Sequence, residues 1–390
     1  MNARLLSILF IVATALLLFG LPIPTHAIED PLAKPNNKHG IHILFDTELD
    51  EAAALVNSNG GQWGYVVIPI QAGDRNLEKW QEFMNKAKKL KIIPIVRLAT
   101  EGDYFNTKVW RKPKEEDVLD FANFLNSLYW PIKNRYVIVF NEVNRDDEWG
   151  GSANPREYAQ LLSYASIVFK SLDPDFFVLN AGLDNASING NGAINKLTYL
   201  QRMQQSVPGI FNQIDGFNSH AYPNPAFSQP PSSQGVMSLY SFRFERSLIA
   251  QFSEKKLPVF ITETGWSGTS LSDETRAAFY KEAFVGIWSD PDVTAVTPFL
   301  LRAGGGPFEQ FSFINQDGKP TQQYEAVQKI QKIHGQPTLN NTPTPTPQVL
   351  GTETKEVKDL PSLWFPQEEK QKKISKAKTA TGMFSWFFGL

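Results

Sequence analysis

The chain has 390 residues, of which 42% are hydrophobic and 20% charged, and its formal net charge is −2. This composition is ordinary for a globular protein, and the small net charge gives no general attraction to nucleic acid. The chain has no cysteine, which excludes disulfides, thiolate catalysis and cysteine-ligated metals, and its five histidines form no HExxH or similar ligand pair. We therefore expect no nucleic-acid partner, no metal and no other cofactor.

Residues 1–27 have the pattern of an export signal. Arg4 supplies a positive start, an uncharged run extends from Leu5 to Gly20, and a cleavage site follows at Ala27. We predict cleavage after Ala27. The alternative is an uncleaved membrane anchor, because the apolar run is near the lower length limit for spanning. Both alternatives place the folded domain outside the cytoplasm, either secreted or tethered to a membrane.

Eight short apolar runs follow along the chain, separated by longer segments. The runs occupy residues 41–45, 65–70, 92–99, 136–140, 176–181, 214–222, 258–266 and 293–301. Most are rich in Val, Ile and Phe without strict alternation, which is typical of strands buried on both faces of a parallel sheet. Segments between them, such as 77–90, 115–130 and 273–288, have apolar residues at every third or fourth position. This spacing indicates amphipathic helices.

Eight strand–helix alternations predict an α/β fold, a (β/α)8 TIM barrel, over residues 40 to about 335. An open doubly wound sheet is the alternative, but it would more often have five or six strands. The glycine-rich motifs of nucleotide-binding sheets are also absent from the sequence. We therefore assign residues 28–336 to one domain.

The composition changes after Gln336. Residues 337–348 form a Pro/Thr linker, and residues 354–378 carry many Lys and Glu. We assign 337–390 to this linker and a flexible charged and aromatic tail. The end of the tail, 370–390, combines a basic stretch with aromatic residues and could contact a membrane surface. A disordered tail with a chance aromatic cluster is the alternative. The sequence gives no cue to the oligomeric state.

Two carboxylates stand where a barrel of this kind carries its chemistry, at the carboxyl ends of the strands. Asn141 and Glu142 follow the fourth run directly, and Glu263 lies near the end of the seventh run. Hydrolysis of a glycosidic bond needs one carboxylic acid to protonate the leaving oxygen, and a second carboxylate to attack the anomeric carbon or activate water. We therefore predict that these two residues form a glycosidase site.

Local motifs strengthen this prediction. The run VIVFNEV resembles the acid/base strand of the clan A retaining glycoside hydrolases, and FITETGW resembles their nucleophile strand. The short motifs Asn-Glu-Val and Glu-Thr-Gly-Trp are closest to those of the family 17 β-1,3-glucanases, and FNSHAYPNP is similar to strand six of families 5 and 39. The resemblance covers residues 40–335 and is specific at the level of the clan.

The resemblance implies a role for each matching residue. Glu142 would be the general acid/base, Glu263 the nucleophile, and Asn141 a hydrogen-bond partner of the sugar 2-hydroxyl. His220 and Tyr222, on the sixth run, match residues that orient the nucleophile or contact sugar. A buried structural histidine is the alternative for His220.

Four further residues are candidates for substrate binding. Arg97 lies near the end of the third run and could steady the nucleophile's charge, although the corresponding arginine of the clan usually lies on strand two. Arg302 ends the eighth run, where many clan members carry a tryptophan platform that this chain lacks. We expect Trp149 or Trp266 to replace that platform, with a place in the core as the alternative for Trp266.

These residues predict a retaining hydrolase that cleaves a β-linked oligo- or polysaccharide by double displacement. Two alternatives stay open. One is a non-catalytic carbohydrate-binding or cell-surface protein on the same fold, against which the presence of both Glu142 and Glu263 argues. The other is a cell-wall transglycosidase, which shares the covalent intermediate and differs in its acceptor.

Overall fold

The computed structural model describes residues 28–102 and 107–340, and these contain eight parallel strands. The strands are β1 (Gly40–His42), β2 (Gly64–Gln71), β3 (Ile92–Ala99), β4 (Arg135–Val139), β5 (Phe176–Asn180), β6 (Phe217–His220), β7 (Val259–Glu263) and β8 (Val293–Val296). β1 to β5 pair in chain order in one sheet, and β6 to β8 pair in a second. Parallel bridges between Leu179 and Gly216 and between His39 and Val296 span the two seams. The strands therefore follow one another around a (β/α)8 barrel.

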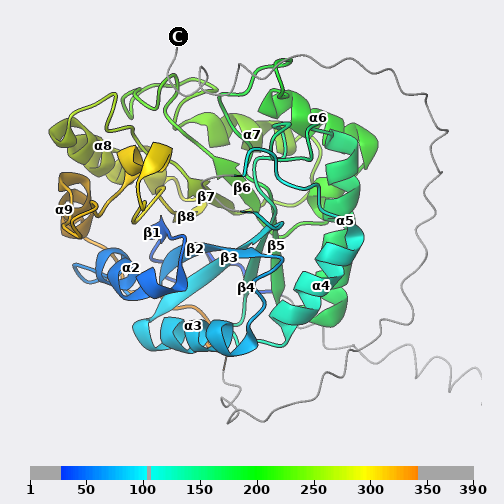
Figure 1. Cartoon of the computed structure of the whole chain (residues 1–390), viewed down its shortest axis with the longest axis horizontal. Coiled ribbons are helices and arrows are strands. Elements are labelled where there is room, and N and C mark those ends of the chain that lie inside the picture. The colour runs from blue at the N-terminus through cyan, green and yellow to red at the C-terminus, as the bar shows by residue number, and fades with distance from the viewer. Residues whose placement is uncertain (1–27, 103–106, 341–390) are drawn as a thin grey trace, which may run out of the picture.

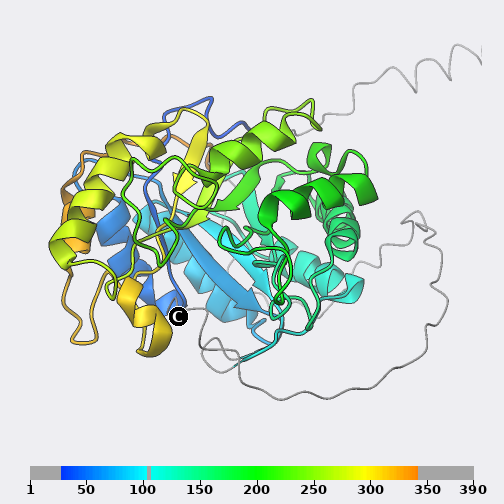
Figure 2. The same cartoon turned by 90° about the horizontal axis from the view of Figure 1, so that it is seen from above.

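Helices surround these strands, as Figures 1 and 2 show from two directions. They are α2 (Leu49–Val56), α3 (Leu77–Leu90), α4 (Glu115–Asn126), α5 (Pro155–Leu172), α6 (Lys196–Ser206), α7 (Ser241–Ile249), α8 (Asp273–Val285) and α9 (Gln322–Lys329). Their ends follow from local chemistry. The side chain of Asn76 accepts a hydrogen bond from the backbone of Lys79 at the start of α3, and Asn154 caps α5 ahead of Pro155.

The apolar faces of the helices are buried against the barrel. α3 buries Trp80, Phe83, Met84 and Ala87, which recur at helical spacing on one face. Inside the barrel, aromatic rings fill the space below the carboxyl ends of the strands. Tyr136 lies with its ring centroid 4.8 Å from that of Phe177 and 5.4 Å from that of Phe260. This packed interior forms a floor beneath the rim that carries the polar residues.

The predicted fold is confirmed, with one systematic difference at the strand ends. Each apolar run overlaps a strand, but runs such as 214–222 and 258–266 extend past β6 and β7. Their last residues leave the sheet and enter the rim. The predicted helix at 77–90 coincides with α3, whereas 115–130 and 273–288 are longer than α4 and α8.

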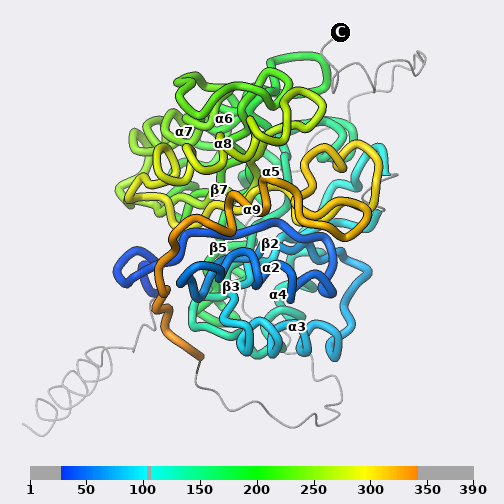
Figure 3. The backbone as a smooth tube through the Cα atoms, turned by 90° about the vertical axis from the view of Figure 1, so that its left-hand side faces the viewer, coloured from blue at the N-terminus to red at the C-terminus, as the bar shows by residue number. Residues whose placement is uncertain are grey.

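The two ends of the described chain lie side by side (Figure 3). The backbone N–H of Gln336 donates to the carbonyl of Pro35, and Thr338 and Asn340 bond to the segment before β4. Residues 337–340, assigned to the linker from composition, are thus attached to the barrel. The expected signal, 1–27, and the tail beyond Asn340 lie outside the described residues. Within residues 28–102 and 107–340, no helix has the length and hydropathy needed to cross a membrane.

Candidate active site

Glu142 lies on the rim just after β4, in a loop with an unusual backbone. Phe140 and Glu142 both have positive φ angles, 69° and 35°. Non-glycine residues adopt such angles only when their surroundings hold them there, and these residues concentrate at functional sites. The backbone N–H of Glu142 donates to the carbonyl of Gly182, just after β5, at 3.0 Å. The loop after β4 is therefore fixed to the loop after β5.

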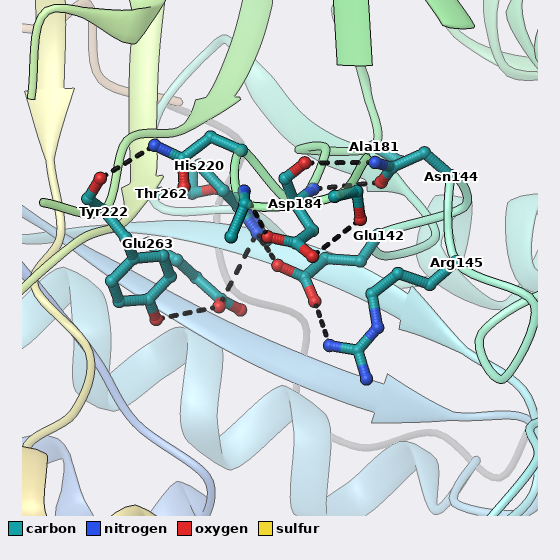
Figure 4. A network of polar contacts seen from close by, with 12 residues as sticks. Glu142, Asn144, Arg145, Ala181, Asp184, His220, Tyr222, Thr262 and Glu263 are labelled. Atoms are coloured by element: carbon teal, nitrogen blue, oxygen red, sulfur yellow. Dashed lines mark hydrogen bonds and ion pairs between the residues drawn. The ribbon is translucent and has the colours of Figure 1, made fainter. Parts of the chain in front are cut away.

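Two cationic groups hold the Glu142 carboxylate (Figure 4). His220 Nδ1 lies 3.0 Å from Oε1, and Arg145 Nη1 donates to Oε2 at 3.0 Å, while the same guanidinium also binds Asp147. Glu142 is buried, with 8% of its surface exposed. Burial alone would raise the pKa of Glu142, but the hydrogen bond from His220 and the charge of Arg145 outweigh it and lower the pKa to about 2.

Glu263 ends β7 and faces the same space from the other side. The hydroxyl of Tyr222 donates to its Oε2 at 3.1 Å, and His220 Nδ1 lies 3.6 Å from the same oxygen. Burial raises the pKa of Glu263, and the negative charge of Glu142 adds to this increase against the opposing effects of His220 and Arg97. The two carboxyls therefore differ in proton affinity, and the proton is favoured on Glu263 over Glu142.

His220 stands between the two carboxylates. One oxygen of Glu142, one oxygen of Glu263 and a ring nitrogen of His220 all lie within 4.8 Å of one another. Burial alone would lower the pKa of His220, but the charges of Glu263 and Glu142 outweigh it and raise the pKa. These three groups are also the set, among the described residues, that could hold a metal ion. An imidazole between two carboxylates can equally hold a proton and pass it on, which is the chemistry that hydrolysis needs.

Further polar contacts hold the loops around the two carboxylates. Asn144 exchanges hydrogen bonds with the backbone of Asp184, at 2.9 and 3.0 Å, and so joins the loops after β4 and β5 (Figure 4). Behind His220, Glu245 of α7 accepts a hydrogen bond from Ser219 and pairs with Lys196 of α6 at 3.0 Å. Both members of this ion pair are buried, with side-chain exposures of 0% and 2%.

Six of the predicted residues meet at this rim. Besides the two carboxylates, His220 and Tyr222, the structure brings in Asn141, whose Oδ1 is buried without a hydrogen-bond partner among the described residues. Arg97 lies in β3 with 9% of its surface exposed, and its charge acts on Glu263 and His220. The substrate-binding roles of Asn141 and Arg97 stay predictions.

Three of the predicted residues do not join the site. Trp149 is 2% exposed and packs edge-on against Tyr158, and Trp266 is fully buried against Tyr280. The expected tryptophan platform is therefore wrong for both residues, because neither ring offers a free face. Arg302 points to α2, where it pairs with Glu51 at 2.7 Å.

The structure adds residues that the sequence analysis missed. Arg145 contacts Glu142 directly, and a cation three residues after a candidate catalytic carboxylate is a visible signal. In the same loop, burial raises the pKa of Glu148 to about 7. His42 of β1 is fully buried, with Nδ1 3.7 Å from Glu263 Oε1. Burial and the charge of Arg97 hold the pKa of His42 well below its ordinary value.

An aromatic group lines the β6 and β8 side of the site. Tyr222, Phe299 and Phe311 are buried in one cluster with Leu44, and the half-buried rings of Phe227 and Phe308 pack against it. The ring of Phe299 meets the ring of His42 edge-on, with centroids 5.1 Å apart. Aromatic rings therefore stand where the sequence analysis expected a tryptophan.

Solved structures with the same fold include several carbohydrate-active enzymes. A family 39 glycoside hydrolase from the gut symbiont Bacteroides cellulosilyticus WH2 matches with a TM-score of 0.54 and 16% identity, over 77% of this chain and 64% of that protein. A GH39 β-xylosidase from Caulobacter crescentus matches with a TM-score of 0.54 and 16% identity, over 78% of this chain and 72% of its own. A GH5_18 protein from Streptomyces cattleya, in complex with GlcNAc, matches with a TM-score of 0.54 and 16% identity, over 76% and 80%.

These comparisons show a shared fold. The chain spans less than two thirds of the length of the first of these proteins. No protein-family model and no curated protein matches the sequence.

Proposed function

We propose that this protein is a retaining glycoside hydrolase that cleaves the O-glycosidic bonds of a β-linked glycan by double displacement. The observation that carries the proposal is the pair of buried carboxylates, Glu142 and Glu263, with oxygens within 4.8 Å of each other. Retaining enzymes keep their carboxyls about 5–5.5 Å apart, whereas inverting enzymes leave about 6.5–9.5 Å for a water molecule. The 4.8 Å limit applies to one oxygen of each carboxyl, and this close approach supports a covalent glycosyl-enzyme intermediate.

In this proposal Glu263 attacks the anomeric carbon, and Glu142 protonates the leaving oxygen. The lowered pKa of Glu142 suits the second step, in which an ionised Glu142 accepts a proton from the attacking water. The first step needs the opposite arrangement, with the proton on Glu142. We therefore propose that the leaving-group oxygen enters between Glu142 and Arg145, and that the guanidinium keeps its contact with Asp147 when it releases Glu142.

The surrounding side chains support the binding of a sugar. Asn141 carries a buried acceptor without a partner among the described residues, and such groups in native structures call for a ligand or water. The half-buried rings of Phe227 and Phe308 offer apolar surface next to Tyr222. We propose that these rings contact the apolar face of the sugar in place of the expected tryptophan. Arg97 would hold the ionised form of Glu263 during attack.

A screen of the purified domain on laminarin, cellulose, mannan, xylan and chitin oligosaccharides tests the proposal. We expect the release of new reducing ends from at least one glycan, and loss of that release in Glu263→Gln. Binding without cleavage on every glycan would contradict the proposal and support the carbohydrate-binding alternative. Products longer than the substrate would identify a transglycosidase.

We further propose that the domain acts outside the cytoplasm, since residues 1–27 have the pattern of an export signal. Fractionation of cells that produce the full chain tests this location, and recovery in the cytoplasm alone would contradict it. Contact of the tail with a membrane is a separate proposal. Sedimentation with anionic vesicles, with and without residues 370–390, tests it, and equal recovery in the pellet would remove it.

A further inference from the structure

Gly182 leaves a space that the ring of His220 fills. A Cβ atom placed on Gly182 would lie 2.0 Å from His220 Cδ2, 2.3 Å from Nε2 and 2.8 Å from Cγ. Real Cβ atoms do not come within 3.0 Å of a neighbour, so no side chain at position 182 is compatible with this ring position. The φ angle of Gly182 lies outside the left-handed region, so the need for glycine here comes from space and not from backbone conformation.

The ring of His220 cannot yield to such a side chain by a simple shift. Its Cδ2–Nε2 edge faces Gly182, while Nδ1 on the other side is already 3.0 Å from Glu142 and 3.6 Å from Glu263. His220 is 1% exposed, and the neighbouring Ser219 is bound to Glu245 of α7. A methyl group at position 182 would therefore force the ring to rotate out of its contact with the carboxylates.

Gly182 also contacts Glu142, whose carboxylate is the hydrogen-bond partner of His220. Its carbonyl accepts the backbone N–H of Glu142 at 3.0 Å. One residue thus anchors the loop that carries Glu142 and leaves room for the imidazole that binds the Glu142 carboxylate. We infer that Gly182 is a positioning residue, which sets the contact of His220 with Glu142 and through it the protonation of the carboxylate pair. This inference rests on the proposed function for its meaning, but its first test does not depend on activity.

The charged groups around His220 determine in which direction its pKa should change when the ring is displaced. Glu142 after β4 and Glu263 of β7 favour the imidazolium, and Arg97 of β3 opposes it. Glu245 of α7 and His42 of β1 also interact electrostatically with His220. Displacement of the ring from the carboxylates should lower the pKa of His220 and raise the pKa of Glu142, since each group stabilises the charged form of the other.

The first test is an NMR titration of histidine-labelled full-length protein, with the His220 signal assigned through its absence in His220→Ala. In Gly182→Ala we expect the His220 midpoint to fall by about one pH unit or more. Gly304→Ala serves as the control, because Gly304 lies in the loop after β8 and a Cβ atom added there would meet no described atom of another segment within 4 Å. An unchanged His220 midpoint in Gly182→Ala would overturn the inference, whether or not the protein cleaves a glycan.

The second test is a double-mutant cycle. Removal of the ring removes the overlap, so Gly182→Ala should lower the melting temperature and reduce kcat/KM ~10²-fold in the wild-type background, but have little effect in His220→Ala. If Gly182→Ala alone fails to fold, recovery of folded protein in the double variant is the expected result. An equal effect of Gly182→Ala in both backgrounds, or failure of both variants to fold, would show that Gly182 acts through something other than His220.

Discussion

Replacement of Arg145 by methionine should shift the pH dependence of the reaction. The guanidinium lies 3.0 Å from Glu142 Oε2 and is one of two groups that lower the pKa of Glu142 from 4.5 to about 2. An opposite charge at this range typically lowers a carboxyl pKa by about 1–3. Loss of Arg145 should therefore return the pKa of Glu142 to about 3–5. The active form of the pair carries one proton on Glu142, so a higher affinity for this proton keeps the enzyme active to higher pH.

The measurement is the pH profile of kcat/KM on the glycan that the wild-type protein cleaves. We expect the alkaline limb of Arg145→Met to move upward by about one pH unit. Lys112→Met is a matched control. It removes the same charge, but Lys112 pairs with Glu157 on the surface and does not contact Glu142. An unchanged alkaline limb in Arg145→Met, or the same shift in Lys112→Met, would refute the electrostatic argument.

Three further predictions concern hydrogen bonding, buried charge and acidity. Tyr222→Phe removes the hydrogen bond that stabilises ionised Glu263. The acidic limb of the pH profile should therefore move to higher pH, and kcat should fall by about 10–100-fold. An unchanged kcat would contradict the role of this bond. Lys196→Met leaves buried Glu245 unpaired and should lower the free energy of unfolding by about 3–5 kcal/mol in urea titrations, whereas Lys196→Met/Glu245→Leu should recover most of this loss. Glu48 is 6% exposed and burial raises its pKa from 4.5 to about 7, so its stabilising contribution is complete below pH 4.5 and is lost as the pH rises through 7. Unfolding measurements at pH 4.5 and pH 8 should show that Glu48→Gln removes on the order of 2–3 kcal/mol of this pH dependence, and parallel curves for both proteins would contradict it.

The barrel could be predicted because its pattern is local. Each strand is a short run of apolar residues, and a helix such as α3 carries its buried face at regular spacing. The place of the two carboxylates follows from the same pattern, since the ends of parallel strands meet at one rim. Glu142, Glu263, His220 and Tyr222 each follow or end such a run, so chain order alone brings them together.

The remaining features of the site depend on contacts between distant segments. Whether Trp266 lines a subsite or fills the core is decided by Tyr280 of α8, and Arg302 is drawn from the rim by Glu51 of α2. His42 stands inside an apolar run and looks like an ordinary strand residue. The requirement for glycine at position 182 is set by the ring of His220, which lies 38 positions along the chain. None of these contacts leaves a periodic signal in the sequence.

The most direct test of the central claim is the anomeric configuration of the azide product formed by two alanine variants. An activated aryl glycoside that the wild-type protein cleaves is incubated with sodium azide, and the glycosyl azide is analysed by proton NMR. In Glu263→Ala the nucleophile is gone, so azide attacks the anomeric carbon directly and the product should have inverted configuration. In Glu142→Ala the glycosyl-enzyme still forms, so azide should displace Glu263 and give a product with retained configuration. Full activity without azide in either variant, or a retained product from Glu263→Ala, would contradict the assignment of Glu263 as nucleophile and Glu142 as acid/base.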